Sequence, residues 1–286
     1  TFLRNRRDWC REQGSEYLLV VAPNKSSVYQ HYIPSRVTPL HDQSRLDQIL
    51  ASLPNDLQGH ILDLRPTLRA AATTEQVFHK ADSHWNDRGA YLAYASILEQ
   101  LAKRRPGSWA EPVGVDRVAD EVSGDGDFAH LLKCKELCME SRPKYEIRGG
   151  ARSREIEFDL DTLGVLTPTE DWPWFAKQLA FEQIDKERDL PRAVMLRDSF
   201  TSAMVQFMAE NFERVTFLWQ PNFNATDKML NHLDAKHVLA EKPDFVIEEV
   251  VERYMAYDPP GVEVEQNPAD DIDDIDDIDG IYASKE

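Results

Sequence analysis

Short runs of consecutive apolar residues recur along this sequence, and helix-like segments separate them. The first is Tyr17–Ala22 (YLLVVA), which Pro23 ends, and later runs are Ala193–Arg197 (AVMLR), Arg214–Trp219 (RVTFLW) and Asp244–Ile247 (DFVI). A strand that is apolar at consecutive positions is typical of a parallel sheet whose two faces are both covered by helices. The pattern therefore predicts an α/β fold with a mostly parallel, doubly wound sheet in three layers.

Helix-like patterns occupy most intervals between these runs. We expect helices over Phe2–Gln13, His41–Leu53, Leu64–Ala72, Asn86–Arg104, Thr201–Asn211, Thr226–Leu233 and Glu248–Met255, and a further strand at His60–Leu64. The span 105–190 lacks this regular alternation, apart from strand-like pieces at Tyr145–Arg148 and Glu155–Leu160. We interpret that span as an irregular insertion or substrate-side subregion within one domain that covers residues 1–257.

The charge distribution separates a C-terminal tail from the rest of the chain. The sequence has 286 residues with 51 acidic and 33 basic side chains, which gives a formal net charge of −18. Residues 258–286 hold eleven of the acidic side chains and a single basic one, Lys285, so this tail carries −10 and the remainder about −8. A DDIDDIDDID run is too acidic to pack on itself, and we expect a disordered acidic tail.

The bulk composition also excludes several classes of function. A strongly negative chain is a poor candidate for binding the phosphate backbone of nucleic acids. There is no run of about 18 apolar residues, so no transmembrane segment is expected. Neither a GxGxxG nor a GxxxxGK[ST] motif occurs, so no nucleotide cofactor is expected. The chain opens at Thr1 without Met, and we expect an upstream signal or anchor that it does not contain.

The sharpest local signal is the run ADSHWN, which lies directly before the helix expected from Asn86. Asp82 and His84 lie two residues apart in it, so on a loop the carboxylate can accept a hydrogen bond from one imidazole nitrogen. Such a bond fixes the tautomer and stabilises the imidazolium that forms when the other nitrogen takes a proton. A purely structural loop pair is the alternative, because the DxH pattern is common.

A second signal is Ser199, which lies between an apolar strand and a helix-like segment. A strand-to-helix turn exposes a hydroxyl at the carboxyl edge of the sheet, where open α/β folds bind their ligands. Backbone N–H groups at the start of the following helix can stabilise an oxyanion. The alternative is that Ser199 only caps that helix.

Several segments, spread from Tyr17 to Met255, resemble one family. The run MLRDSF resembles the GDS block of SGNH hydrolases, and DSHWNDRGAY resembles the DxHWN…GA block of the alginate O-acetyltransferases AlgJ and AlgX. The segments VVAPNKSSVYQHYIP, SGDGDFAHLL and KPDFVIEEVVERYM fit the same group. Because these matches keep their order, the chain resembles the AlgJ/AlgX-like family of the SGNH hydrolase-like superfamily.

This resemblance implies an SGNH-hydrolase-like catalytic domain over residues 1–257, with Ser199 as nucleophile, His84 as general base and Asp82 as its orienter. It implies transfer of acetyl groups to hydroxyls of an exopolysaccharide, alginate or similar, in a periplasmic or secreted setting. The acetyl donor would be a membrane-bound acyltransferase partner, with no cofactor and no metal in this chain. A polysaccharide acetyl esterase of the same fold and an inactive polysaccharide-binding protein are the alternatives.

Six further residues are candidate substrate or oxyanion contacts: Asn24, Lys25, Trp85, Arg197, Trp219 and Asn222. Asn24 or Lys25 could supply a second oxyanion donor, although Asn24 also fits a plain turn residue. Trp85 could stack on a sugar ring or be a buried aromatic. Arg197 stands where the GDS block usually has Gly, which would alter the oxyanion hole. Trp219 and Asn222 follow a strand at the same sheet edge and could line a groove, and Tyr29 is a weaker candidate for the wall of that groove.

Two smaller clusters leave alternatives open. The run HKADSH brings together His79, Asp82 and His84, which could ligate zinc but would leave the serine without a role. Cys134 and Cys138 have four-residue spacing, which fits either a disulfide or two free thiols.

Overall fold

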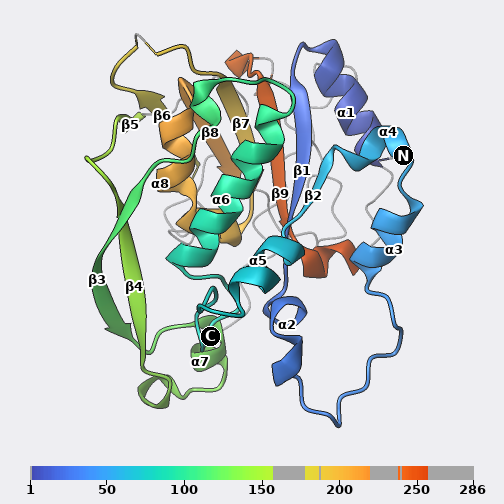
Figure 1. The fold of residues 1–286 in the computed structure, drawn as a ribbon, viewed down its shortest axis with the longest axis vertical. Coiled ribbons are helices and arrows are strands. Elements are labelled where there is room, and N and C mark those ends of the chain that lie inside the picture. The colour runs from blue at the N-terminus through green and yellow to red at the C-terminus, as the bar shows by residue number, and fades with distance from the viewer. Residues whose placement is uncertain (1, 157–177, 187, 220–237, 239, 257–286) are drawn as a thin grey trace, which may run out of the picture.

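The fold is built on a central seven-stranded sheet with strand order β2-β1-β9-β7-β8-β6-β5 (Figure 1). We describe it in a computed structural model, for residues 2–156, 178–186, 188–219, 238 and 240–256. The strands are β1 Glu16–Ala22, β2 Ile61–Asp63, β3 Val115–Ser123, β4 Glu140–Ile147, β5 Ser153–Ile156, β6 Leu179–Gln183, β7 Arg192–Arg197, β8 Arg214–Trp219 and β9 Phe245–Val251. Five neighbouring strands, β2 to β8, are parallel, which confirms the expected mostly parallel α/β sheet.

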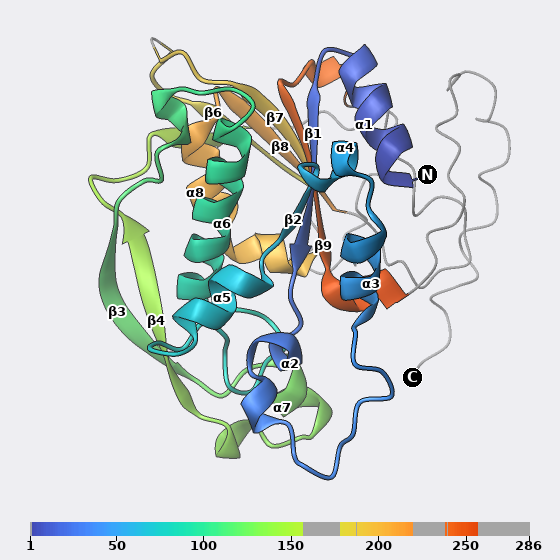
Figure 2. The ribbon, with the colours of Figure 1, turned by 45° about the vertical axis from the view of Figure 1, so that its right-hand side comes forward.

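Helices cover both faces of this sheet (Figure 2). The α-helices are α1 Phe2–Glu12, α2 Lys25–Val28, α3 Arg45–Ser52, α4 Asn55–Gln58, α5 Arg65–Ala71, α6 Asp87–Ala102, α7 Asp127–Leu131 and α8 Val205–Met208. The 3-10 helices are η1 Gln30–Tyr32, η2 Ser108–Ala110, η3 Lys135–Leu137, η5 Ser199–Ala203, η6 Ala209–Asn211 and η8 Glu252–Ala256. Among the described residues, none of these helices is long and apolar enough to cross a membrane.

The core is divided into two clusters by the sheet, as a three-layer fold requires. One cluster joins apolar side chains of α5, α6 and α8 to one face of the strands. The other joins side chains of α1 and α3 to the opposite face. Strand β1 is buried at six of its seven positions, because helices cover it on both sides.

Helix α6 fixes the loop that precedes it. The Asn86 side chain caps the helix by accepting a hydrogen bond from the Gly89 N–H at 3.0 Å, and its amide donates to the Gln76 carbonyl at 2.8 Å. A side chain at position 89 would collide with the Val77 carbonyl oxygen and with Cβ of Trp85. The glycine therefore lets the first turn of α6 lie directly on residues 77–85.

The span 105–190, expected to be an irregular insertion, divides into two parts in the structure. Strands β5 and β6 belong to the central sheet, where β6 lies antiparallel to β8. Strands β3 and β4 form a separate antiparallel pair that stands beside α6 (Figure 1). The Cys134 and Cys138 thiols of the segment between these two strands are free and lie 3.2 Å apart.

Three helix expectations need correction. The segment Glu248–Met255 is not one helix, because β9 continues to Val251 and only Glu252–Ala256 forms a 3-10 helix. Glu248 and Glu249, the first two residues of that expected helix, are buried in the sheet. Thr201–Asn211 is divided among η5, α8 and η6 rather than forming one helix. The helix expected from His41 begins at Arg45, because Ser44 and Asp47 form a capping box there.

Other expectations fall outside the described residues. These are the helix over 226–233, the part of the 155–160 strand beyond residue 156, the candidate Asn222 and the acidic tail over 258–286. The remaining expected strands and helices are present, with ends that differ by a few residues.

Candidate active site

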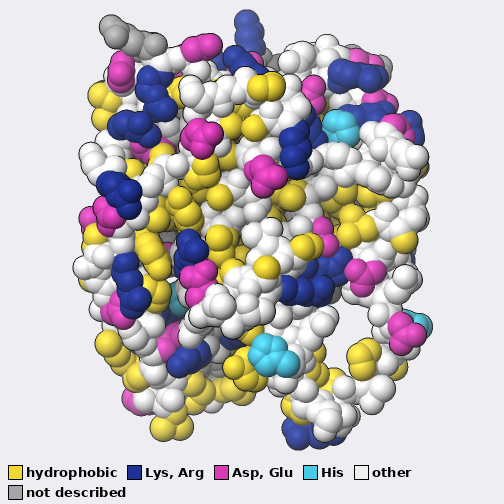
Figure 3. Space-filling view, viewed as in Figure 1, with side chains coloured by type: hydrophobic (Ala, Val, Ile, Leu, Met, Phe, Trp, Pro, Cys, Tyr) yellow, Lys and Arg dark blue, Asp and Glu magenta, His cyan; other side chains and the backbone are white. Residues whose placement is uncertain are grey.

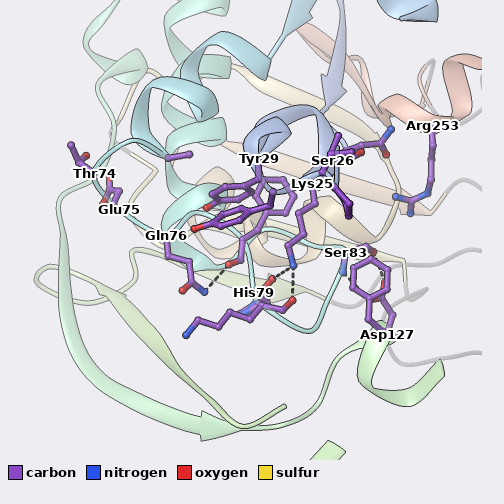
Figure 4. A pocket seen from close by; sticks show the side chains of 18 residues that line it. Lys25, Ser26, Tyr29, Thr74, Glu75, Gln76, His79, Ser83, Asp127 and Arg253 are labelled. Atoms are coloured by element: carbon purple, nitrogen blue, oxygen red, sulfur yellow. Dashed lines mark hydrogen bonds between the residues drawn. The ribbon is translucent and has the colours of Figure 1, made fainter. Parts of the chain in front are cut away.

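The loop that carries Asp82 and His84 is held in place by Lys25, which opens α2 directly after β1. The Lys25 Nζ donates hydrogen bonds to the carbonyl oxygens of His79, Lys80 and Asp82 at 2.6, 2.7 and 3.1 Å (Figure 4). This ammonium is thus engaged with backbone carbonyls, and the expectation that it serves as an oxyanion donor is corrected. Its position instead ties the loop to the carboxyl end of β1.

Asp82, His84 and Ser199 form a continuous chain of hydrogen bonds. The His84 Nδ1 lies 2.6 Å from Asp82 Oδ1, and the His84 Nε2 lies 2.7 Å from Ser199 Oγ. The His84 backbone N–H also donates to the same Asp82 oxygen at 3.0 Å. Asp82 and His84 come from the loop before α6 and Ser199 from the end of β7, so tertiary folding brings residues 115 positions apart into contact.

The environment of Asp82 favours its ionised form. Burial by itself would raise the pKa of this carboxyl group, but hydrogen bonds from the ring and the backbone of His84 outweigh it and lower the pKa to about 2. A permanent carboxylate at Nδ1 directs the other ring nitrogen, Nε2, toward Ser199 as a proton acceptor. The arrangement can therefore deprotonate the serine hydroxyl.

Ser199 is the first residue of the 3-10 helix η5. Asp198 caps this helix by accepting a hydrogen bond from the Phe200 N–H at 2.8 Å. Amide hydrogens in the first turn of a helix have no acceptor within the helix, and Asp198 accepts the one from Phe200. Helix capping thus falls to Asp198, and the alternative that Ser199 is only a cap is wrong.

A cavity of about 1140 Å³ opens beside this loop. It reaches Ser83, which lies between Asp82 and His84. Four aromatic side chains line it, from the residue after α2, from η1, from the loop and from α7: Tyr29, Tyr32, Phe78 and Phe128 (Figure 4). The segment after α2 stands away from the body and leaves an opening beside it (Figure 3). The space is large enough for a ligand of several sugar rings.

Tyr32 and Arg253 are two side chains that line the cavity. The Tyr32 side chain is 76% exposed although it lines the cavity, so its ring is available to a ligand. The Arg253 guanidinium lies over the ring of Phe200, 5.6 Å from its centroid, and forms no ion pair with a described carboxylate. Sequence reasoning missed Tyr32, Phe128 and Arg253, because no motif marks them and only the fold brings them to one cavity.

Asn24 lies at the edge of the cavity, at the N-cap of α2. Its backbone N–H donates to Glu252 Oε2 at 2.9 Å, so that group is not available as an oxyanion donor. The Asn24 side-chain amide forms no hydrogen bond with the described part of the chain. Asn24 could therefore act as an oxyanion donor only through its side-chain amide, and this role stays a prediction.

Trp85 and Arg197 do not reach a ligand. Both are only 1% exposed. The Trp85 indole donates to the Phe200 carbonyl at 2.8 Å, so the buried-aromatic alternative is correct and the sugar-stacking role is wrong. The Arg197 guanidinium packs on the Trp219 ring and donates to Ser202 Oγ at 3.2 Å, inside the protein rather than in an oxyanion hole. Trp219 itself is half-buried, and its role as a groove residue stays a prediction.

A metal ion could be held by one cluster among the described residues, made of Asp82, His84 and Asp127. His79 is not part of it, so the zinc set expected from HKADSH does not assemble. Asp127 accepts hydrogen bonds from the Ser83 backbone N–H, at 2.7 Å, and from the Ser83 hydroxyl. Since Asp82 and Asp127 already have hydrogen-bond donors, these residues fit loop anchoring as well as metal binding.

Comparison with known proteins gives one family match. Residues 1–159 match the family model described as "SGNH hydrolase-like domain, acetyltransferase AlgX". The matched span contains Asp82 and His84 but ends before Ser199. The chain is also 28% identical over 168 residues to the Pseudomonas putida protein named "Probable alginate O-acetylase AlgJ", an alignment that covers 56% of this chain and 41% of that relative.

Solved structures show the same fold. The structure of Bacillus cereus PatB1 with a sulfonyl adduct has a TM-score of 0.60 at 14% identity, covering 90% of this chain and 88% of that one. The O-acetyltransferase domain of Pseudomonas putida AlgJ has a TM-score of 0.55 at 18% identity, covering 93% of this chain and 84% of that one. At such identities the likeness concerns the fold alone.

Proposed function

We propose that this chain, which belongs to the family of SGNH hydrolase-like domains of acetyltransferase AlgX, is a serine-dependent O-acetyltransferase that acts on an exopolysaccharide, alginate or a similar polymer. The observation that carries the proposal is the hydrogen-bonded chain Asp82–His84–Ser199 beside an aromatic-lined cavity. The similarity to a protein named as an alginate O-acetylase supports this substrate class, although the chain spans only 41% of that relative's length.

In the first half of the reaction, the Ser199 oxygen attacks the carbonyl carbon of an acetyl donor while His84 Nε2 takes the hydroxyl proton. Asp82 stabilises the resulting imidazolium through its hydrogen bond to Nδ1. When the bond between the acetyl group and its carrier breaks, the leaving group receives the proton from His84. The product is an acetyl ester on Ser199 with His84 neutral again.

In the second half, a sugar hydroxyl bound in the cavity loses its proton to His84 and attacks the acetyl-serine carbonyl. The bond between Ser199 Oγ and the acetyl carbon breaks, and His84 returns the proton to the serine oxygen. The aromatic rings of the cavity supply flat apolar surfaces for sugar rings. A transferase differs from an esterase in that its cavity holds a sugar hydroxyl, rather than water, next to the acetyl-serine.

The setting is part of the same proposal. We assign residues 1–257 to the catalytic domain, a periplasmic or secreted location, and a membrane-bound acyltransferase as the source of acetyl groups. These assignments rest on the family and on the alginate-modifying relative. The acetyl donor and the acceptor are both substrates of the proposed reaction.

The central test uses an aryl acetate as donor and measures release of the aryl alcohol. Ser199→Ala, His84→Ala and Asp82→Ala should each lower turnover by about a thousandfold or more, without lowering the melting temperature by more than a few degrees. The combined variants should lose little beyond the single ones, because the three residues act as a unit. Full activity in Ser199→Ala would contradict the serine mechanism.

A second measurement separates the transferase from its alternatives. Enzyme is incubated with the donor and a panel of oligosaccharides, and both enzyme and sugars are examined by mass spectrometry. One acetyl group on the Ser199 peptide and on a sugar supports the transferase. Acetate without acetylated sugar indicates an esterase. Wild-type protein that retains polysaccharide but never becomes acetylated indicates a binding protein.

A further inference from the structure

Two buried acidic side chains lie behind the turn that presents Ser199, and the acyl transfer gives neither a role. Asp198 follows the last residue of β7, directly before the serine. Glu249 lies in the neighbouring strand β9. Both are at least nine-tenths buried, at 8% and 1% exposure. Acidic side chains are rarely so buried unless a specific partner compensates for the loss of water.

These two carboxyl groups hold the turn through backbone contacts. Asp198 Oδ1 accepts from the Phe200 N–H at 2.8 Å and Oδ2 accepts from the Val251 N–H at 2.9 Å. Glu249 Oε2 accepts from the Asp198 N–H at 3.2 Å and from the Thr201 hydroxyl at 2.8 Å. The residues on both sides of Ser199 are thereby tied to β9.

The remaining oxygen of Glu249 indicates where a proton lies. Oε1 of Glu249 is buried and accepts no hydrogen bond from the described residues. A buried carboxylate oxygen without a donor is costly, and two adjacent carboxylates repel each other. A proton on Glu249 removes that charge and lets this carboxyl group donate to the neighbouring Asp198 side chain. Asp198 suits the ionised partner, since it accepts two backbone N–H groups.

We propose that Glu249 and Asp198 share one proton, and that this acid pair is the positioning element that holds the Ser199 turn against β9. Glu249 touches no substrate and is a positioning residue rather than a catalytic one. The inference rests on the proposed function, because it assigns a role to the turn that presents the nucleophile.

Charged groups on the surrounding elements favour this state. Burial raises the pKa of Glu249 well above its ordinary value of 4.5, and the negative charge of Asp198 raises it further. Arg197 on β7 lies close enough to oppose that effect, as does the Thr201 hydroxyl. Burial raises the pKa of Asp198, and Arg253 on η8 opposes that rise and favours the carboxylate. Because the pKa of Glu249 is raised, the shared proton is lost as the pH rises through the folded-state pKa of Glu249.

The experiment compares Glu249→Gln with Glu249→Leu. Glutamine keeps an N–H donor for Asp198 and a carbonyl acceptor for Thr201 without needing a proton, whereas leucine keeps only the volume. Aryl acetate hydrolysis by Glu249→Gln should stay within about threefold of wild type at neutral pH and should lack the wild-type loss of kcat at alkaline pH. Glu249→Leu should lose about tenfold or more in kcat with little change in KM.

Glu248→Gln provides the matched control. Glu248 is equally buried on β9, but its carboxylate accepts from the Tyr17 hydroxyl at 2.6 Å and pairs with Arg6 on the opposite face of the sheet. This variant should change stability while leaving the pH dependence of kcat unchanged. An alkaline limb altered equally in Glu248→Gln would overturn the positioning role, since general destabilisation would explain both.

Infrared spectroscopy tests the proton without relying on activity, and so distinguishes a failure of this inference from a failure of the serine mechanism. Wild-type protein at neutral pH should show the C=O stretching band of a protonated carboxyl group, and Glu249→Gln should lack it. If Glu249→Leu does not fold, Thr201→Val serves instead, and removal of its donated hydrogen bond should move the alkaline loss of kcat to higher pH. Absence of the band in wild type would overturn the shared proton.

Discussion

Tyr32 is more exposed than the other aromatic residues that line the cavity. Its side chain is 76% exposed, while Phe78 is fully buried and the Tyr29 hydroxyl accepts a hydrogen bond from the Val77 N–H at 3.0 Å as part of the loop scaffold. The ring of Tyr32 lies only 4.3 Å from that of His31, which orients it at the mouth. An exposed ring in this position contributes little to folding, so its effect belongs to ligand binding.

We therefore expect Tyr32→Ala to raise KM for an oligosaccharide acceptor by about three- to tenfold, because one stacking surface is worth roughly 1 kcal/mol. The aryl acetate hydrolysis rate and the melting temperature should stay at wild-type values. Acceptor titrations followed by mass spectrometry give the KM. An unchanged KM would place the acceptor elsewhere than at the mouth of this cavity.

Helix α6 shows how one element positions the site. Its N-cap Asn86 and its first turn lie against residues 77–85, and the Trp85 ring packs edge-on to Phe200 at 5.0 Å between centroids. The loop that carries Asp82 and His84 and the turn that carries Ser199 are thus connected by this ring packing, as well as by the hydrogen bond between His84 and Ser199. Precise placement of His84 depends on how closely α6 approaches the loop.

The variant Gly89→Ala tests whether the site depends on the close approach of α6 to residues 77–85. The added methyl group would meet the Val77 carbonyl, so we expect a loss of about 1–3 kcal/mol in the free energy of unfolding and a lower hydrolysis rate. Gly59→Ala is the control, because nothing lies within 4 Å of a Cβ there. Urea denaturation measures both variants. Equal stabilities for the two alanine variants would show that the contact at position 89 can relax without cost.

The whole molecule responds to acid through groups that are buried in particular protonation states. Burial, together with the charge of Arg142, lowers the pKa of His79 from 6.5 to about 4, so the folded protein holds this ring neutral. The unfolded chain takes up a proton near pH 6.5, and stability therefore falls as the pH drops from about 6.5 to about 4. Asp82 adds a further loss below its ordinary pKa of 3.8, as the pH approaches 2.

We expect His79→Gln to reduce the acid-induced fall in the melting temperature between pH 6.5 and 4, because glutamine cannot take up a proton in the unfolded state. Thermal unfolding at a series of pH values measures this dependence. His130→Gln is the control, since that histidine is exposed. Identical pH dependences for His79→Gln and wild type would show that His79 is not held neutral in the fold.

The sequence by itself determined the α/β class, most strand and helix positions and the three residues of the hydrogen-bonded chain. It could do so because apolar runs mark strands buried on both faces, and because ordered segments containing the three residues resemble those of the AlgJ/AlgX-like family. Only the tertiary structure decided which polar residues are buried. Glu248 and Glu249 begin a segment that the sequence predicts to be helical, yet pairing of β9 with β1 and β7 places them inside the sheet. Tyr32, Phe128 and Arg253 line one cavity only because distant segments fold together, a juxtaposition that no local pattern encodes.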